Sequence, residues 1–123
     1  MKFTKDHEWV KVDGDIAIIG ISDYAQKALG DIVSIELPKV GRAVKQGESF
    51  CIVDSMKASS EVYAPISGKV SEVNHALSDN PQWINESCYE KGWIAKLKVS
   101  DLKELDKLMD DHTYKNYISG LKH

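Results

Sequence analysis

The segment around Lys57 constrains the fold of this chain more than any other feature. Apolar residues dominate both flanks, from Glu48 to Pro65, whereas small and polar residues surround the lysine itself. Two glycines, Gly47 and Gly68, bracket the unit on either side. Two short apolar runs separated by a tight polar turn are typical of a β-hairpin. The pattern therefore predicts a hairpin that carries an amine outward at its tip.

The expected pairing follows if Met56 and Lys57 are the two loop residues. The predicted pairs are Phe50 with Tyr63, Cys51 with Val62, Ile52 with Glu61, and Asp54 with Ser59. Strand side chains alternate between faces, so one face is apolar enough to form a core and the other is mixed. The apolar face holds Cys51, Val53, Val62 and Ala64, and the mixed face holds Phe50, Ile52, Asp54, Glu61 and Tyr63.

Length and composition predict one domain spanning residues 1–123. The chain has 123 residues, of which 42% are hydrophobic, and this is enough to bury a core. A formal charge of −3 argues against nucleic-acid binding, which requires a basic surface. No apolar run is long enough to span a membrane. We expect a monomer in the bacterial cytoplasm, or in the mitochondrial matrix if a transit peptide has been removed.

Other segments predict a mainly β fold. A hairpin is expected from Trp9 to Ile21 with its turn at Asp13-Gly14, followed by a short helix that Ser22 caps and Gly30 closes. Further strands are predicted by alternation at Ile32–Leu37, Lys69–Asn74 and Gly92–Val99. These elements indicate a small β-sandwich or barrel with short helices.

The remaining helices are predicted near Pro81 and in a C-terminal segment. Pro81 is expected in the first turn of a brief helix carrying Trp83 and Ile84. After Ser100, a candidate N-cap, one helical stripe holds Leu102, Leu105, Leu108 and Met109. A second short helix is expected over Tyr114–Ile118.

Lys57 is the candidate for chemistry, although a single lysine in a turn is usually only a solvated charge. An exposed amine can be acylated and become the root of a flexible arm. A Schiff-base lysine is disfavoured, because it normally needs burial to lower its pKa. Asp54 and Glu61 are expected on one strand face below the lysine, and Glu8 is a candidate third acidic residue. These carboxylates are either solubilising charges, contacts for the modifying enzyme, or ligands of a cationic load.

No catalytic or metal site is expected. The chain has four histidines, at His7, His75, His112 and His123. They show no metal-ligand spacing, and neither Cys51 nor Cys88 has a CxxC partner. The two cysteines are expected to be a core residue and a loop thiol, respectively. There is no phosphate-binding glycine loop and no nucleophile elbow.

Several fragments together resemble a known family. They are His7–Val10, Ile19–Ser22 with Ala25-Gln26, Leu29–Val33, Glu36–Pro38, Ser55–Ala58, Tyr63–Val70, Glu72–Asn74, Ile84-Asn85 and Gly92-Trp93. In number and order they are similar to the H proteins of the glycine cleavage system, within the biotinyl/lipoyl carrier superfamily. The resemblance implies a barrel-sandwich hybrid with short helices and a C-terminal helical segment.

The resemblance also implies a function and a set of partners. Lys57 would carry lipoate through an amide, and Glu8 and Glu61 would match acidic residues of the cleft that shelters the loaded arm. The partners would be a pyridoxal-phosphate glycine decarboxylase, a tetrahydrofolate-dependent aminomethyltransferase and a dihydrolipoamide dehydrogenase. A lipoyl or octanoyl ligase or transferase would attach the group. The chain itself would be a carrier of the aminomethyl group and not an enzyme.

Two other functions stay open. Met56 stands where biotin carriers typically have Met before their modified lysine, but Ala58 lacks the second Met of that pattern. A lipoyl donor or depot for lipoate metabolism would share the modification at Lys57. The chain also departs from the usual H-protein pattern at Asp6, Asp54 and Cys88.

Overall fold

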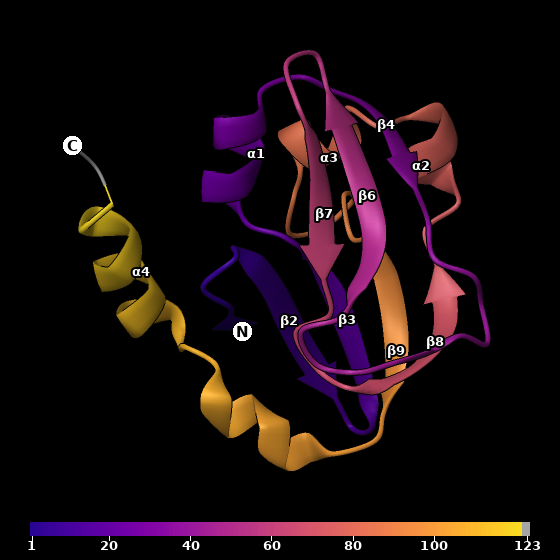
Figure 1. Ribbon diagram of the computed structural model, residues 1–123, viewed down its shortest axis with the longest axis vertical. Helices are drawn as coiled ribbons and strands as arrows, with labels where there is room; N and C mark the ends of the chain where they lie inside the picture. The colour runs from indigo at the N-terminus through magenta and orange to yellow at the C-terminus, as the bar shows by residue number, and fades with distance from the viewer. Residues whose placement is uncertain (122–123) are drawn as a thin grey trace.

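Two antiparallel sheets form the body of the protein in a computed structural model that describes residues 1–121 (Figure 1). Within these residues, the larger sheet has the strand order β1-β2-β3-β9-β8-β5 and the smaller has the order β4-β6-β7. The larger sheet comprises β1 (Lys2–Phe3), β2 (Glu8–Asp13), β3 (Ile16–Ile21), β9 (Ala95–Val99), β8 (Gly68–Val73) and β5 (Ala43–Val44). The smaller sheet comprises β4 (Ile32–Glu36), β6 (Ser49–Ser55) and β7 (Ser59–Tyr63).

Short helices connect and flank the sheets. They are α1 (Asp23–Leu29), α2 (Ala76–Asp79), α3 (Trp83–Glu86), the 3₁₀ helix η1 (Leu102–Lys107) and α4 (Asp111–Ser119). The caps of α1 are as predicted, because the Ser22 hydroxyl accepts a hydrogen bond from the Ala25 amide and Gly30 follows with φ 79°. In the described part of the chain, no helix has the length and apolarity needed to cross a membrane.

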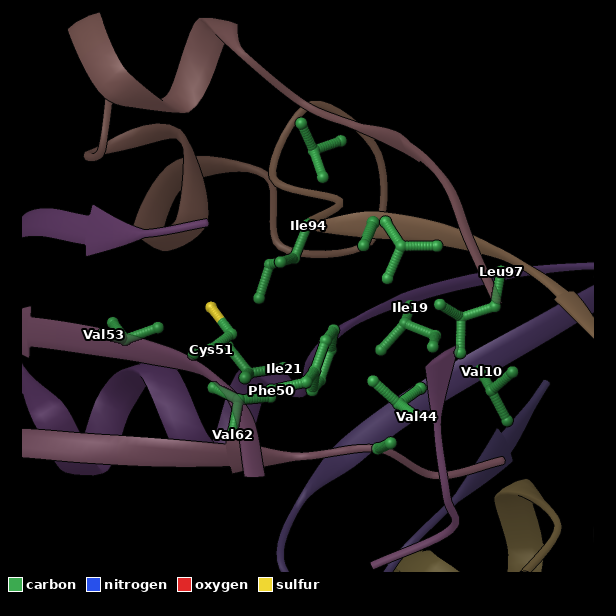
Figure 2. Packing of buried hydrophobic residues seen from close by; sticks show 14 of the residues in the cluster. Val10, Ile19, Ile21, Val44, Phe50, Cys51, Val53, Val62, Ile94 and Leu97 are labelled. Atoms are coloured by element: carbon green, nitrogen blue, oxygen red, sulfur yellow. The ribbon is translucent and has the colours of Figure 1, made fainter. Parts of the chain in front are cut away.

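The apolar core lies between the two sheets. Figure 2 shows Val10, Ile19 and Leu97 from the larger sheet near residues of β6 and β7. The predicted inner face of the Lys57 hairpin is confirmed, since its four residues are all buried. Those residues are Cys51, Val53, Val62 and Ala64.

The placement of Phe50 on the outer face is wrong. Its side chain is only 3% exposed and belongs to the core (Figure 2). The register shifts between Ser49 and Cys51, so Ser49 and not Phe50 pairs with Tyr63. A β-bulge of this kind lets two successive residues oppose one partner and interrupts the alternation of side chains. The pairs from Cys51–Val62 to Asp54–Ser59 are as predicted.

Three other local expectations need correction. The β2–β3 turn is Gly14-Asp15, one residue later than predicted, because Asp13 pairs with Ile16. The cap of the first C-terminal helix is Asp101 rather than Ser100, and this helix is 3₁₀. The expected strand Ile32–Leu37 contains an irregularity near Val33, whose side chain is 49% exposed.

The C-terminal segment wraps around the edge of the larger sheet. The predicted four-residue stripe does not form one helical face, because the 3₁₀ helix ends before Leu108 and Leu102 is exposed. Met109 instead pairs with Phe3 in an isolated bridge. The helix expected at Tyr114–Ile118 is longer at both ends and is capped by Asp110. Its Tyr114 ring stacks on Phe3 at 4.2 Å, which attaches α4 to the body of the protein.

Candidate functional site

The β6–β7 hairpin presents Lys57 at its tip, which projects from the body of the protein (Figure 1). The Ser55 amide donates to the Ala58 carbonyl at 2.8 Å, so Met56 and Lys57 are the two loop residues, as predicted. The Ser55 hydroxyl accepts hydrogen bonds from the amides of Lys57 and Ala58 at 3.3 and 3.1 Å. The Met56 amide donates to the Asp31 carbonyl at 2.9 Å. The tip is therefore braced both internally and against the α1–β4 connection.

The Lys57 side chain is exposed and lies over the end of α1. A Cβ atom added to Gly30 would be 3.5 Å from Lys57 Cε and 4.0 Å from Nζ. Met56 beside it is 76% exposed, more than any other large hydrophobic residue in the described part of the chain. An amine that is open to solvent on a braced turn is accessible to an acylating enzyme.

Asp54 and Glu61 lie on the outer face of the hairpin but have different partners. Asp54 accepts hydrogen bonds from Ser34 at 3.1 Å and from Ser59 at 2.6 Å, and so links all three strands of the smaller sheet below the tip. Glu61 is exposed and accepts a hydrogen bond from the Tyr63 hydroxyl at 3.1 Å.

Glu8 is buried at the start of β2, only 2% exposed. One carboxylate oxygen accepts a hydrogen bond from the Thr4 hydroxyl at 2.5 Å, and the other accepts one from the Tyr63 amide at 3.2 Å. The carboxylate lines a small cavity of about 200 Å³ together with Asp6 and Lys107. Burial raises the pKa of Glu8 to about 7, against the lowering effect of its hydrogen bonds.

Tyr63 links two of the three predicted acidic residues, the buried Glu8 and the exposed Glu61. Its amide binds the Glu8 carboxylate, and its hydroxyl binds Glu61. Asp54 lies nearer the tip and is not part of this arrangement. Sequence reasoning missed Thr4 and the linking function of Tyr63. The presence of a hydroxyl four residues before Glu8 was the available signal for Thr4.

The raised pKa of Glu8 predicts a pH-dependent stability. Since the folded state holds this proton more tightly than the unfolded state, the stabilisation is complete below about pH 4.5 and is lost as the pH rises through about 7. A shift of this size corresponds to about 3 kcal/mol in the free energy of unfolding. Urea titrations from pH 4.5 to 8 should show this loss in the unmodified protein.

The Glu8→Gln variant is the control for this titration. It should be flatter than the unmodified protein over the same pH range, because the amide does not ionise. His7, whose pKa burial lowers, contributes with the opposite sign, but it is present in both proteins and cancels in the difference. Parallel pH profiles for the two proteins would contradict the prediction.

Comparison with known proteins identifies the family. The family model described as glycine cleavage H-protein matches residues 1–120. The chain belongs to this family. It is 51% identical to the glycine cleavage system H protein of Xanthobacter autotrophicus, over 98% of this chain and 97% of that protein. It is 52% identical to the H protein of Carboxydothermus hydrogenoformans, over 96% of this chain and 91% of that protein.

A solved structure also matches the fold of this family member. The crystal structure of a glycine cleavage system H protein from Mycobacterium marinum has a TM-score of 0.84 and 35% identity, covering 97% of this chain and 94% of that chain. The predicted fold class, a lipoyl-domain-like barrel-sandwich with short helices, is thereby confirmed. As a member of the H-protein family, the chain is a lipoyl carrier of the glycine cleavage system.

Proposed function

We propose that Lys57 is the lipoyl attachment residue. In this proposal the chain carries the aminomethyl group between its partner enzymes and has no catalytic centre of its own. The observation that carries this proposal is the exposed Lys57 amine on a hairpin tip held by the Ser55 and Asp31 hydrogen bonds. The site fits the group, because amide formation needs an amine that an acylating enzyme can reach, and the Lys57 side chain is exposed. When bound, lipoate would supply a dithiolane, whose disulfide could take up an aminomethyl group together with the electron pair left by decarboxylation and could be re-formed when dihydrolipoamide dehydrogenase oxidises the freed dithiol.

The acidic residues of the chain would receive the cationic amine of the load. Glu61 offers an exposed carboxylate, and Glu8 offers a buried one at the wall of the small cavity. Tyr63 is six residues beyond Lys57, and at the rise of a β-strand this is a span of about 20 Å. A lysine side chain alone does not cover that span, so the carboxylates could serve only a long arm. Inside the cavity, a carboxylate and an amine would attract each other more strongly than in water.

Asp54 would act at a different stage. Its hydrogen bonds to Ser34 and Ser59 fix the strands immediately below the tip. In this proposal it keeps the hairpin rigid for the lipoyl or octanoyl ligase or transferase that acylates Lys57. The other partners would be the pyridoxal-phosphate decarboxylase, the tetrahydrofolate-dependent aminomethyltransferase and dihydrolipoamide dehydrogenase. We propose a monomer in the cytoplasm, or in the mitochondrial matrix after removal of a transit peptide.

Intact-mass analysis and peptide mapping of protein purified from its native cell test the attachment. We expect a lipoyl mass increment confined to the peptide that contains Lys57. A biotinyl increment on the same peptide would support the biotin-carrier alternative, for which the exposed Met56 is the only structural argument. An unmodified Lys57 in cells that contain lipoate and its ligase would overturn both.

A second measurement separates a cleavage carrier from a lipoyl depot. The lipoylated protein is incubated with glycine and the decarboxylase alone, and release of carbon dioxide is followed. A carrier supports this release, whereas a donor that serves only lipoate metabolism does not.

A further inference from the structure

The loop that precedes Glu8 has an unusual backbone. Residues 4–7 join β1 to β2, and the Thr4 amide donates to the Glu8 carbonyl at 3.0 Å, which closes a loop of three residues, Lys5, Asp6 and His7. His7 has φ 71°, the only non-glycine residue with positive φ in the described part of the chain. Three-residue hairpin loops commonly end in this left-handed conformation, which glycine adopts without strain. A side chain at this position is strained, so the surrounding structure has to hold it there.

Contacts from two helices hold His7. The Ser22 amide donates to the His7 carbonyl at 2.8 Å. His7 Nδ1 and the Tyr114 hydroxyl are 2.8 Å apart, and the same hydroxyl is 2.7 Å from Ser22 Oγ. The imidazole also packs on the Tyr24 ring, with centroids 4.5 Å apart. The N-cap of α1 and the buried Tyr114 of α4 therefore meet on the backbone and ring of this one residue.

The backbone at His7 determines how Glu8 enters β2. The Thr4 hydroxyl accepts a hydrogen bond from the Glu8 amide at 3.2 Å and donates to the Glu8 carboxylate. Both bonds require Thr4 and Glu8 to face each other across the closed loop. With a negative φ at His7 the chain would leave the loop in another direction, and the Glu8 carboxylate would lose Thr4 and its buried place beside Tyr63.

We propose that His7 is a positioning residue for Glu8, and that the Tyr114 hydroxyl of the C-terminal helix holds it in that position. The inference rests on the proposed function, in which the Glu8 carboxylate receives the cationic load. It gives α4 a function at the site, although α4 contributes no residue to the wall of the Glu8 cavity within the described residues. His7 itself is expected to make no contact with the load.

The first test is an NMR titration of the Glu8 carboxyl in the wild-type protein and in two variants, all without lipoate. Tyr114→Phe removes only the hydroxyl, and His7→Gly removes the ring while permitting positive φ. In Tyr114→Phe the strained His7 loses its anchor, so the Glu8 carboxyl becomes better solvated and its pKa falls from about 7 toward 4.5 by about half a unit or more. In His7→Gly the glycine adopts positive φ without strain, so the Glu8 pKa stays near 7. The other charged groups near Glu8, Asp6 and Lys107, are unchanged in both.

Tyr89→Phe is the matched control. It also removes a phenol hydroxyl bonded near the start of α1, where Tyr89 accepts from the Asp23 amide, but it does not touch His7. Its Glu8 pKa should equal that of the unmodified protein. An unchanged Glu8 pKa in the folded Tyr114→Phe variant would overturn the inference. Tyr114→Phe alone decides the matter if His7→Gly does not fold.

The second test separates this inference from the proposed function. Lipoylated proteins are loaded with the decarboxylase and glycine, and spontaneous hydrolysis of the aminomethyl group to the free thiol, formaldehyde and ammonia is then followed by the release of ammonia. We expect release to be several-fold faster in Tyr114→Phe, because the displaced Glu8 carboxylate no longer faces the load, and at least as fast in Glu8→Gln, which has no carboxylate. If lipoylated Glu8→Gln releases ammonia at the same rate as the lipoylated wild-type protein, the proposed function of Glu8 is wrong, whatever the titration gives. A lowered Glu8 pKa with a normal release rate in Tyr114→Phe, while Glu8→Gln is fast, would overturn the positioning of Glu8 for the load.

Discussion

Replacing Lys57 with Arg is expected to abolish lipoylation and reduce glycine decarboxylation to the assay background. The guanidinium keeps the positive charge, but it stays protonated at any physiological pH and cannot form the amide that the arm requires. The position is exposed at a hairpin tip, and surface substitutions of this kind usually change stability by no more than about 0.5 kcal/mol. The loss should therefore be chemical and not structural. Mass analysis after incubation with the ligase measures it directly, and thermal unfolding shows that the fold is retained.

Lys39→Arg is a suitable control for this experiment. Lys39 is also exposed and lies in a connection between strands, so the substitution is chemically identical and differs only in place. Lys39→Arg should be lipoylated to the same extent as the wild-type protein and should have the same activity. Full activity of Lys57→Arg, with Lys39→Arg behaving in the same way, would show that the carried group is attached elsewhere.

The Lys57 hairpin could be predicted from the sequence because the features that define it lie close together along the chain. Alternation of side chains, bracketing glycines and a two-residue turn determine which residues pair, and four of the five residue pairs observed from Ser49 to Tyr63 follow the expected register. Phe50 was misplaced because a bulge changes the phase of the alternation without leaving a clear mark on the sequence. The same irregularity of phase explains Val33, which belongs to an apolar run and yet faces solvent.

The surroundings of Glu8 could not be predicted because they depend on contacts between distant segments. The carboxylate is bonded to Tyr63, which is 55 positions later in the chain, and Tyr114 reaches His7 across 107 positions. The periodicity of apolar residues in the sequence does not indicate contacts between segments so far apart. Cys88 is a similar case, since it lies in a loop as expected but is buried, where its carbonyl accepts a hydrogen bond from the Trp9 indole at 3.0 Å.

Gly20→Ala is expected to cause the largest loss of stability among these predictions. Gly20 pairs with Trp9 across β2 and β3, and the indole covers the glycine so closely that an added Cβ would lie 2.6–2.7 Å from three of its ring atoms. The indole is only 1% exposed and is held by its hydrogen bond to Cys88, so it has little room to move aside. Overpacking of this kind costs about 3 kcal/mol, or a decrease of about 10 °C in Tm for a domain of this size.

A double-mutant cycle with Trp9→Phe tests the cause of that loss. The indole atoms nearest to the added Cβ are Nε1 of the five-membered ring, Cε2 shared by both rings and Cζ2 of the six-membered ring, and the smaller phenyl ring has no counterpart of Cζ2. Trp9→Phe alone should destabilise the protein, because it removes buried area and the Cys88 hydrogen bond. In the Trp9→Phe background, however, Gly20→Ala should cost about 1–2 kcal/mol less than in the unmodified protein, as measured by urea unfolding. Equal costs in the two backgrounds would mean that the destabilisation comes from the backbone of β3 and not from contact with the indole.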